Sequence, residues 1–118
     1  NLYLTGADEG AKEIARSVRE SSGGLPAVRA IGFAVPERGS VTVSMNLVDI
    51  DVTPPRVAFD AVTKLANERG MQVLSSEIVG LVPAAALGDG DIADLRLEGF
   101  DADEQILERL VNAERNRR

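Results

Sequence analysis

The sequence predicts an α+β fold: a four-stranded antiparallel sheet with two helices on one face, followed by a C-terminal helix. The 118 residues are enough for a single domain of ordinary size, residues 1–118. Hydrophobic residues make up 44% and charged residues 27%, a mixture typical of globular domains. Apolar positions repeat with strand or helix periods in the order strand, helix, strand, strand, helix, strand.

The first half of the chain predicts a strand, a helix and a hairpin. Residues 2–5 form a short apolar strand. A helix after Asp8 buries a stripe spaced i, i+3, i+4, i+7, made of Ala11, Ile14, Ala15 and Val18. Strands over residues 27–35 and 41–50 flank the Pro-Glu-Arg-Gly turn at residues 36–39, so they are expected to pair as a hairpin.

The second half predicts a helix, a strand and a last helix. Thr53 is the expected N-cap of a helix that begins with two prolines, because proline in the first turn lacks only an N–H that the helix does not use. The helix is expected to bury Val57, Ala58, Ala61, Val62, Leu65 and Ala66. A strand starts at Met71 and runs toward Pro83, and the last helix starts near Asp103 with Ile106, Leu107, Leu110 and Val111 on one side.

This order of elements is the split βαβ arrangement of ferredoxin-like folds, which leaves one face of the sheet open. Alternation along the third strand places Thr42, Ser44 and Asn46 on the open face. The apolar set that alternates with them, Val41, Val43, Met45 and Leu47, is expected under the helices. These small polar side chains suit contact with a ligand or a partner domain. An ordinary solvated face is the alternative that periodicity leaves open.

The composition restricts the chemistry. Cysteine and histidine are both absent, so the chain has no thiolate nucleophile and no side chain whose ordinary pKa suits proton transfer near neutral pH. Catalysis by this chain alone would need carboxylates, hydroxyls, lysine or arginine. We predict no metal site.

The charge distribution is uneven. The net charge is −6, and seven acidic residues lie between Asp89 and Glu104 against Arg96 alone. We interpret this stretch as a solvated loop in preference to a cation site. With no basic stripe and 3% aromatic residues, the sequence predicts no nucleic-acid partner.

The ends and hydropathy of the sequence bear on its location. No run of about 18 apolar residues predicts a membrane span, and no basic-then-apolar leader is recognisable, so a cytoplasmic protein is expected. The chain opens inside a predicted strand at Asn1 without an initiator methionine. We interpret it as a piece of a longer polypeptide.

Glu77 is the carboxylate whose sequence context is most informative. It precedes the apolar run Ile78-Val79-Gly80-Leu81-Val82, where an acid is expected to be paired or functional. Two roles remain open at this point: capping local backbone N–H groups, or contacting a ligand.

Four ordered segments resemble glutamate formiminotransferases, including the formiminotransferase domain of formiminotransferase-cyclodeaminase. They are residues 20–32 (ESSGGLPAVRAIG), 43–47 (VSMNL), 76–83 (SEIVGLVP) and 97–107 (LEGFD with QIL behind it). The resemblance covers most of the chain and is to the second of two ferredoxin-like subdomains. The family transfers the formimino group of N-formimino-L-glutamate to tetrahydrofolate, in histidine degradation and one-carbon metabolism.

The resemblance implies a folate tunnel between the two subdomains, a catalytic histidine in the first, and a glycine-rich basic folate-binding segment upstream of Asn1. It implies substrate contacts at Ser44, Asn46 and Glu77, tetrahydrofolate as co-substrate, and the N-terminal subdomain as partner. A homo-oligomer is also expected. This chain alone is expected to be inactive. The alternative is a non-catalytic ferredoxin-like module that binds a small molecule or dimerises through its open sheet face.

Overall fold

The computed structural model describes residues 1–19, 21, 23–88 and 90–116. Its elements, in chain order, are β1 (Leu2–Leu4), α1 (Asp8–Val18), β2 (Val28–Val35), the 3-10 turn η2 (Pro36–Arg38), β3 (Ser40–Leu47), α2 (Pro55–Glu68), β4 (Val73–Ser76), the 3-10 turn η3 (Ala84–Ala86), α3 (Asp91–Asp94), α4 (Ala102–Gln105) and α5 (Leu107–Asn116).

The four strands form one antiparallel sheet in the order β2-β3-β1-β4. The central strand β1 pairs with β3 on one side, where Leu2 lies opposite Val43, and with β4 on the other, where Leu2 lies opposite Ser76. The predicted hairpin is confirmed by the eight paired positions of β2 and β3. This arrangement confirms the predicted α+β class and is consistent with a ferredoxin-like sandwich.

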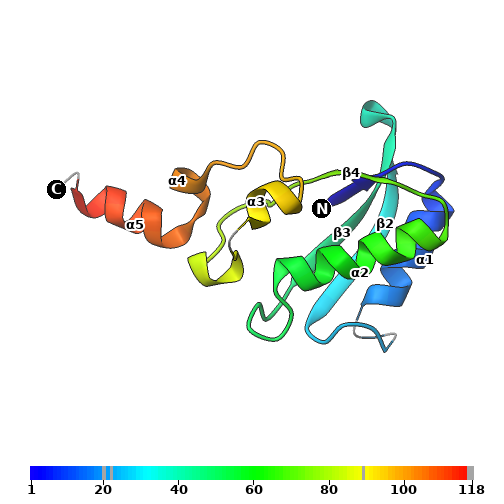
Figure 1. Ribbon diagram of the computed structural model, residues 1–118, viewed down its shortest axis with the longest axis horizontal. Coiled ribbons are helices and arrows are strands. Elements are labelled where there is room, and N and C mark those ends of the chain that lie inside the picture. Colours follow the sequence, from blue (N-terminus) through cyan, green and yellow to red (C-terminus); the bar gives the residue numbers. More distant parts are fainter. Residues whose placement is uncertain (20, 22, 89, 117–118) are drawn as a thin grey trace.

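Two helices and the sheet make up the main core, while the C-terminal elements extend away from it (Figure 1). Helices α1 and α2 cover one face of the sheet, and α3, α4 and α5 follow one another toward the far end of the molecule. The long axis measures 50 Å against 31 and 21 Å for the other two. The main core contains Leu2, Leu4, Ile14, Val18, Val28, Val41, Val43, Phe59, Val62 and Val73.

Close approach of α1 to the sheet determines which side chains of β2 face the helices. A Cβ on Gly32 would lie 2.3 Å from the backbone carbon and oxygen of Ala11, so that position accepts glycine alone. Ala30, two residues earlier, is buried on the same face. The bulkier Ile31 and Phe33 therefore point to the open face, where they are 61% and 42% exposed.

The start of α2 differs from the prediction. The helix begins at Pro55 with Pro54 as N-cap residue, and no side chain caps it. The hydroxyl of Thr53, the predicted cap, donates instead to the carbonyl oxygen of Pro26 at 2.6 Å. The two prolines explain this difference, because they remove N–H donors that a capping hydroxyl would serve.

The buried stripe of α2 is also rotated relative to the prediction. Val57 is 44% exposed, whereas Phe59, which the prediction left out, is 8% exposed and belongs to the core with Val62 and Ala66. The spacing of these three residues, i, i+3 and i+7, is that of one helix face.

The predicted last helix is broken in two at Ile106. The backbone of Ile106 is extended and pairs in parallel with Val82: the N–H of Val82 donates to Gln105, and the N–H of Leu107 donates back to Val82. Ile106 is buried with Val82 and Ala86 in a second small core. Burial of Ile106 thus interrupts the helical pattern, and β4 ends at Ser76, well before the predicted Pro83.

We expect Gly32→Ala to destabilise the fold by about 1–3 kcal/mol or more, since the new methyl group would meet backbone atoms that cannot rotate away. Gly88→Ala is the matched control, because its Cβ would meet Asp91 Oδ2 at an ordinary 3.6 Å. Urea unfolding of both variants tests this. Equal midpoints would contradict the close packing of β2 against α1.

Candidate functional site

The open face of the sheet is half polar and half apolar. The cross-strand pairs of β2 and β3 place Thr42 beside Phe33, Ser44 beside Ile31, and Asn46 beside Arg29. The polar row that alternation predicted is therefore present, but exposed apolar side chains run next to it. An apolar strip of this kind on a sheet face is typical of a surface that contacts a ligand or another domain.

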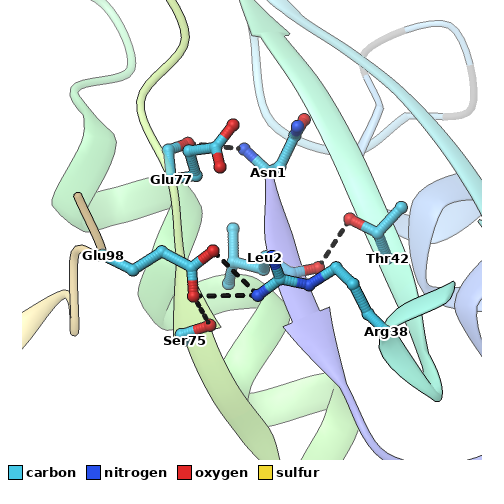
Figure 2. A network of polar contacts seen from close by, with 7 residues as sticks. All are labelled: Asn1, Leu2, Arg38, Thr42, Ser75, Glu77 and Glu98. Atoms are coloured by element: carbon cyan, nitrogen blue, oxygen red, sulfur yellow. Dashed lines mark hydrogen bonds and ion pairs between the residues drawn. The ribbon is translucent and has the colours of Figure 1, made fainter. Parts of the chain in front are cut away.

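The prediction for Thr42 is wrong in one respect. Thr42 is 1% exposed, and its hydroxyl donates to the carbonyl oxygen of Leu2 at 2.8 Å (Figure 2). Its polar group is thus used inside the fold, where it joins β3 to β1. Ser44 is half-buried and Asn46 is exposed, so these two side chains remain accessible on the predicted face.

A polar network lies on this face over Tyr3 of the central strand β1 (Figure 2). The Arg38 guanidinium stacks 3.7 Å from the ring centroid of Tyr3, and its Nη2 lies 2.8 Å from both carboxylate oxygens of Glu98. The Ser75 hydroxyl donates to the same carboxylate at 2.7 Å. Residues from three separate parts of the chain thus close over the ring of Tyr3, which is 8% exposed.

Backbone pairing brings Glu98 to this position. Leu97 forms a parallel bridge with Ser76 on the outer side of β4: the N–H of Ser76 donates to Arg96, and the N–H of Glu98 donates to Ser76. The hydrogen bonds that Arg38 and Ser75 donate lower the pKa of the Glu98 carboxyl, and donation to Glu98 raises the pKa of Arg38. Sequence reasoning missed this network, because a pairing between residues 38 and 98 leaves no periodic signal.

The acidic stretch is only partly the solvated loop that the sequence predicted: Asp94, Asp101, Asp103 and Glu104 are exposed, but Asp91 is buried. Asp91 is 3% exposed and accepts hydrogen bonds from Arg56 Nε at 2.5 Å and from the Gly88 N–H at 2.6 Å. Asp94 also pairs with Arg56, at 2.8 Å. Asp101 accepts from two N–H groups at the start of α4.

Asp89, which the interpretation also included, lies outside the described residues. Among the described residues, no three acidic side chains come close enough together to hold a metal ion. In the same part of the chain, no helix is both long and apolar enough to cross a membrane.

A groove of about 440 Å³ opens at the end of the sheet beyond β1. Asn46 and Glu77, two of the three predicted substrate-contacting residues, line it together with Asn1. Ser44 does not line the groove. Most of the remaining lining is apolar, and includes Met45, Leu47, Ala58, Phe59, Ile78, Val79 and Leu81.

Glu77 is half-buried at the mouth of this groove, and its backbone is fixed by Asn1 (Figure 2). The backbone N–H of Glu77 donates to the backbone carbonyl oxygen of Asn1 at 2.8 Å, and the amino group of Asn1 donates to the backbone carbonyl oxygen of Glu77 at 3.0 Å. No hydrogen bond or ion pair joins the Glu77 carboxylate to another described residue. The Glu77 side chain therefore does not cap backbone N–H groups of the described residues, which was one of the two roles that the sequence left open.

Together these features define the class of protein as a two-layer α+β domain with one open sheet face. The fold is a two-layer α+β sandwich that presents hydroxyl, amide and carboxylate groups beside apolar side chains, and its 118 residues contain no histidine. Surfaces that combine such groups can form both hydrogen bonds and apolar contacts.

Comparison with known protein families identifies the family of this chain. The family model described as the formiminotransferase domain matches residues 1–111, and the chain belongs to this family. The predicted resemblance is confirmed.

Curated relatives agree with this membership. The chain is 39% identical over 116 residues to a glutamate formimidoyltransferase of Thermoplasma acidophilum, covering 98% of the chain and 38% of that relative. It is 38% identical over 98 residues to one of Streptococcus pyogenes, covering 83% and 33%. A formimidoyltransferase-cyclodeaminase of Sus scrofa is 37% identical over 95 residues, covering 75% and 18%. The chain thus spans well under half the length of these relatives.

We expect Glu98→Gln to weaken the acid dependence of folding. Because the folded pKa of Glu98 is depressed, its stabilising contribution is present above the ordinary glutamate value of about 4.3 and is lost as the pH falls through the folded pKa. The variant should have a lower unfolding midpoint at pH 7 and lose less stability between pH 5 and pH 3 than the parent. Urea unfolding across this range measures both.

Glu68→Gln on the exposed end of α2 is the control for loss of one negative charge. Identical pH profiles for the parent and Glu98→Gln would show that the Arg38–Glu98 pair contributes nothing to folding.

Proposed function

We propose that this chain is the C-terminal subdomain of a cytoplasmic glutamate formiminotransferase, which transfers the formimino group of N-formimino-L-glutamate to tetrahydrofolate. In this proposal the chain supplies one wall of the folate-binding tunnel, and an N-terminal subdomain supplies the other. The observation that carries the proposal is the family match over residues 1–111. Relatives named glutamate formimidoyltransferase support it.

The chemistry of the transfer supports a division of labour between two subdomains. An amine of the reduced folate attacks the formimino carbon, the bond from that carbon to the glutamate nitrogen breaks, and protons leave one nitrogen and reach the other. Moving those protons near neutral pH calls for a group with a matching pKa. The chain has no histidine, so the proposal places that group on the other subdomain.

The open face and the adjoining groove suit the role of a binding wall. A folate molecule combines flat apolar rings with amide and carboxylate groups, and this surface offers Ile31 and Phe33 next to Ser44 and Asn46. In the proposal Ser44 and Asn46 donate or accept hydrogen bonds to the substrates. Glu77 lines the groove, and its carboxylate interacts electrostatically with the Asn1 amino group and with Arg38. In the proposal this carboxylate accepts a hydrogen bond from a substrate N–H.

We expect the purified chain to form no formiminotetrahydrofolate from formiminoglutamate and tetrahydrofolate. Adding a separately expressed N-terminal subdomain should produce a complex in sedimentation and restore turnover, because the open face would then be covered. Turnover by the chain alone would contradict the proposed placement of the catalytic group. A self-associated chain that ignores the N-terminal subdomain would favour the non-catalytic module instead.

We expect Glu77→Gln to leave the unfolding free energy of this chain within about 0.5 kcal/mol of the parent, because its carboxylate accepts no internal hydrogen bond. In the full-length enzyme the same change should reduce kcat/KM by about tenfold or more, as loss of a charged hydrogen bond does. Glu68→Gln, outside the groove, should change neither quantity. Loss of stability without loss of activity would show that Glu77 is structural.

A further inference from the structure

Strand β2 is an open edge of the sheet. It is eight residues long and pairs along its whole length with β3, and no described strand lies on its other side. The opposite edge strand, β4, has only four residues, and Leu97 pairs beside it. Long edges are usually protected by proline, lysine or a bulge, because they offer hydrogen bonds to another strand. Strand β2 has no proline, no lysine and no bulge, and Arg29 is its one charged residue.

Half of the backbone groups of β2 point away from the sheet. The Val48 N–H donates to the carbonyl oxygen of Ala27, directly before β2, so the backbone groups of Ala27 face the β3 side. Since successive residues alternate in direction, the N–H and C=O groups of the even-numbered residues from Val28 to Ala34 face outward. No backbone hydrogen bond joins these outward groups to another described residue. The edge is therefore able to pair with a further strand.

The side chains of β2 are complementary to an antiparallel copy of the same strand. When Phe33 lies opposite Phe33 of a second copy, Ile31 lies opposite Val35, and Arg29 lies opposite Glu37 in η2. Because the outward backbone groups belong to the even positions, these odd positions form the non-hydrogen-bonded pairs, in which side chains are closest. An aromatic pair at the centre is thus flanked on each side by an aliphatic pair and an opposite-charge pair.

The charged residues at the two ends identify a second copy of this chain as the occupant. Arg29 and Glu37 are both exposed, and neither forms an ion pair with another described residue. A pocket of about 310 Å³ beside the start of β2 is lined by Arg19, Ser21 and Arg29, with no acidic residue among its described lining. Antiparallel pairing brings the hairpin tip that carries Glu37 to this pocket of the other copy. Such complementary charges set the register of association.

The helix face of β2 contributes little bulk at the centre of this pairing. Its residues there are Ala30, Gly32 and Ala34, and the backbone of α1 lies directly over Gly32. Strand β2 therefore places no large side chain between α1 and its copy, and the two helices are free to lie side by side above the joined strands.

We propose that two copies of this chain associate through β2, which pairs antiparallel with its copy about a two-fold axis at Phe33. The two four-stranded sheets become one continuous sheet, and their open faces become one surface. The proposal concerns the assembly of the sheet and does not rest on the transfer reaction.

Cysteine cross-linking tests the register, because the chain has no cysteine of its own. Phe33→Cys places the two thiols opposite each other at a Cα separation of about 4.5 Å, which a disulfide can span. Ile31→Cys is the matched control, because residue 31 lies about 13 Å along the strand from its own copy. We expect a disulfide-linked dimer of Phe33→Cys under mild oxidation and none of Ile31→Cys. Mixing Ile31→Cys with Val35→Cys, which keeps Phe33 intact, should give the linked heterodimer.

Charge reversal tests the two ends of the pairing. Arg29→Glu and Glu37→Arg each place like charges opposite each other, so each variant alone should self-associate about tenfold more weakly than the parent in sedimentation equilibrium. An equimolar mixture of the two restores both opposite-charge pairs and should recover the affinity of the parent. Glu68→Arg, on the exposed end of α2, makes the same change in net charge as Glu37→Arg and should leave association unchanged.

Four outcomes would overturn the proposal. The parent stays monomeric in sedimentation, Ile31→Cys cross-links as readily as Phe33→Cys, or the mixture of charge variants associates no better than either variant alone. The fourth is that a supplied N-terminal subdomain, and not a second copy of the chain, protects the Gly32 and Ala34 amides from hydrogen exchange.

Discussion

The pairing of the three-residue strand β1 with β3 on one side and β4 on the other holds this molecule together. Leu2 and Leu4 are buried beneath the helices, and Tyr3 is buried on the opposite face. Without β1, strand β4 would have no antiparallel partner among the described strands. The position of β4 therefore depends on these three residues, including that of Ser75 on the open face. Glu77, directly after β4, is held by its backbone hydrogen bonds to Asn1.

The difference between the two sheet faces follows from how closely α1 approaches. Gly32 and Ala30 leave room for the helix backbone, and the bulky residues of β2 are displaced to the open face as a result. That face then carries an apolar strip beside a polar row, with the Arg38–Glu98 pair closing over Tyr3 at one end. The packing requirement on one side of the sheet has thus placed the bulky apolar side chains of β2 on the other side.

The C-terminal third of the chain is attached by single pairings and by ion pairs. Leu97 pairs beside Ser76, Ile106 pairs beside Val82, and Arg56 on α2 holds the buried Asp91. Each of these contacts joins residues that are far apart in sequence. The segment from Glu77 to Pro83, held by these pairings, lines the groove together with residues of β3 and α2.

The sequence by itself determined the order of the elements, the antiparallel hairpin, the open face and the family. Periodicity and turn residues are local signals, and the four family segments are read directly from the residues. It also placed Ser44 and Asn46 on the correct face, because side chains alternate strictly along a strand. Only the tertiary structure decided that the Thr42 hydroxyl hydrogen-bonds to Leu2, that Ile106 interrupts the last helix, and that Arg38 pairs with Glu98. These outcomes depend on contacts between distant segments, whose geometry is fixed by packing and leaves no periodic trace in the chain.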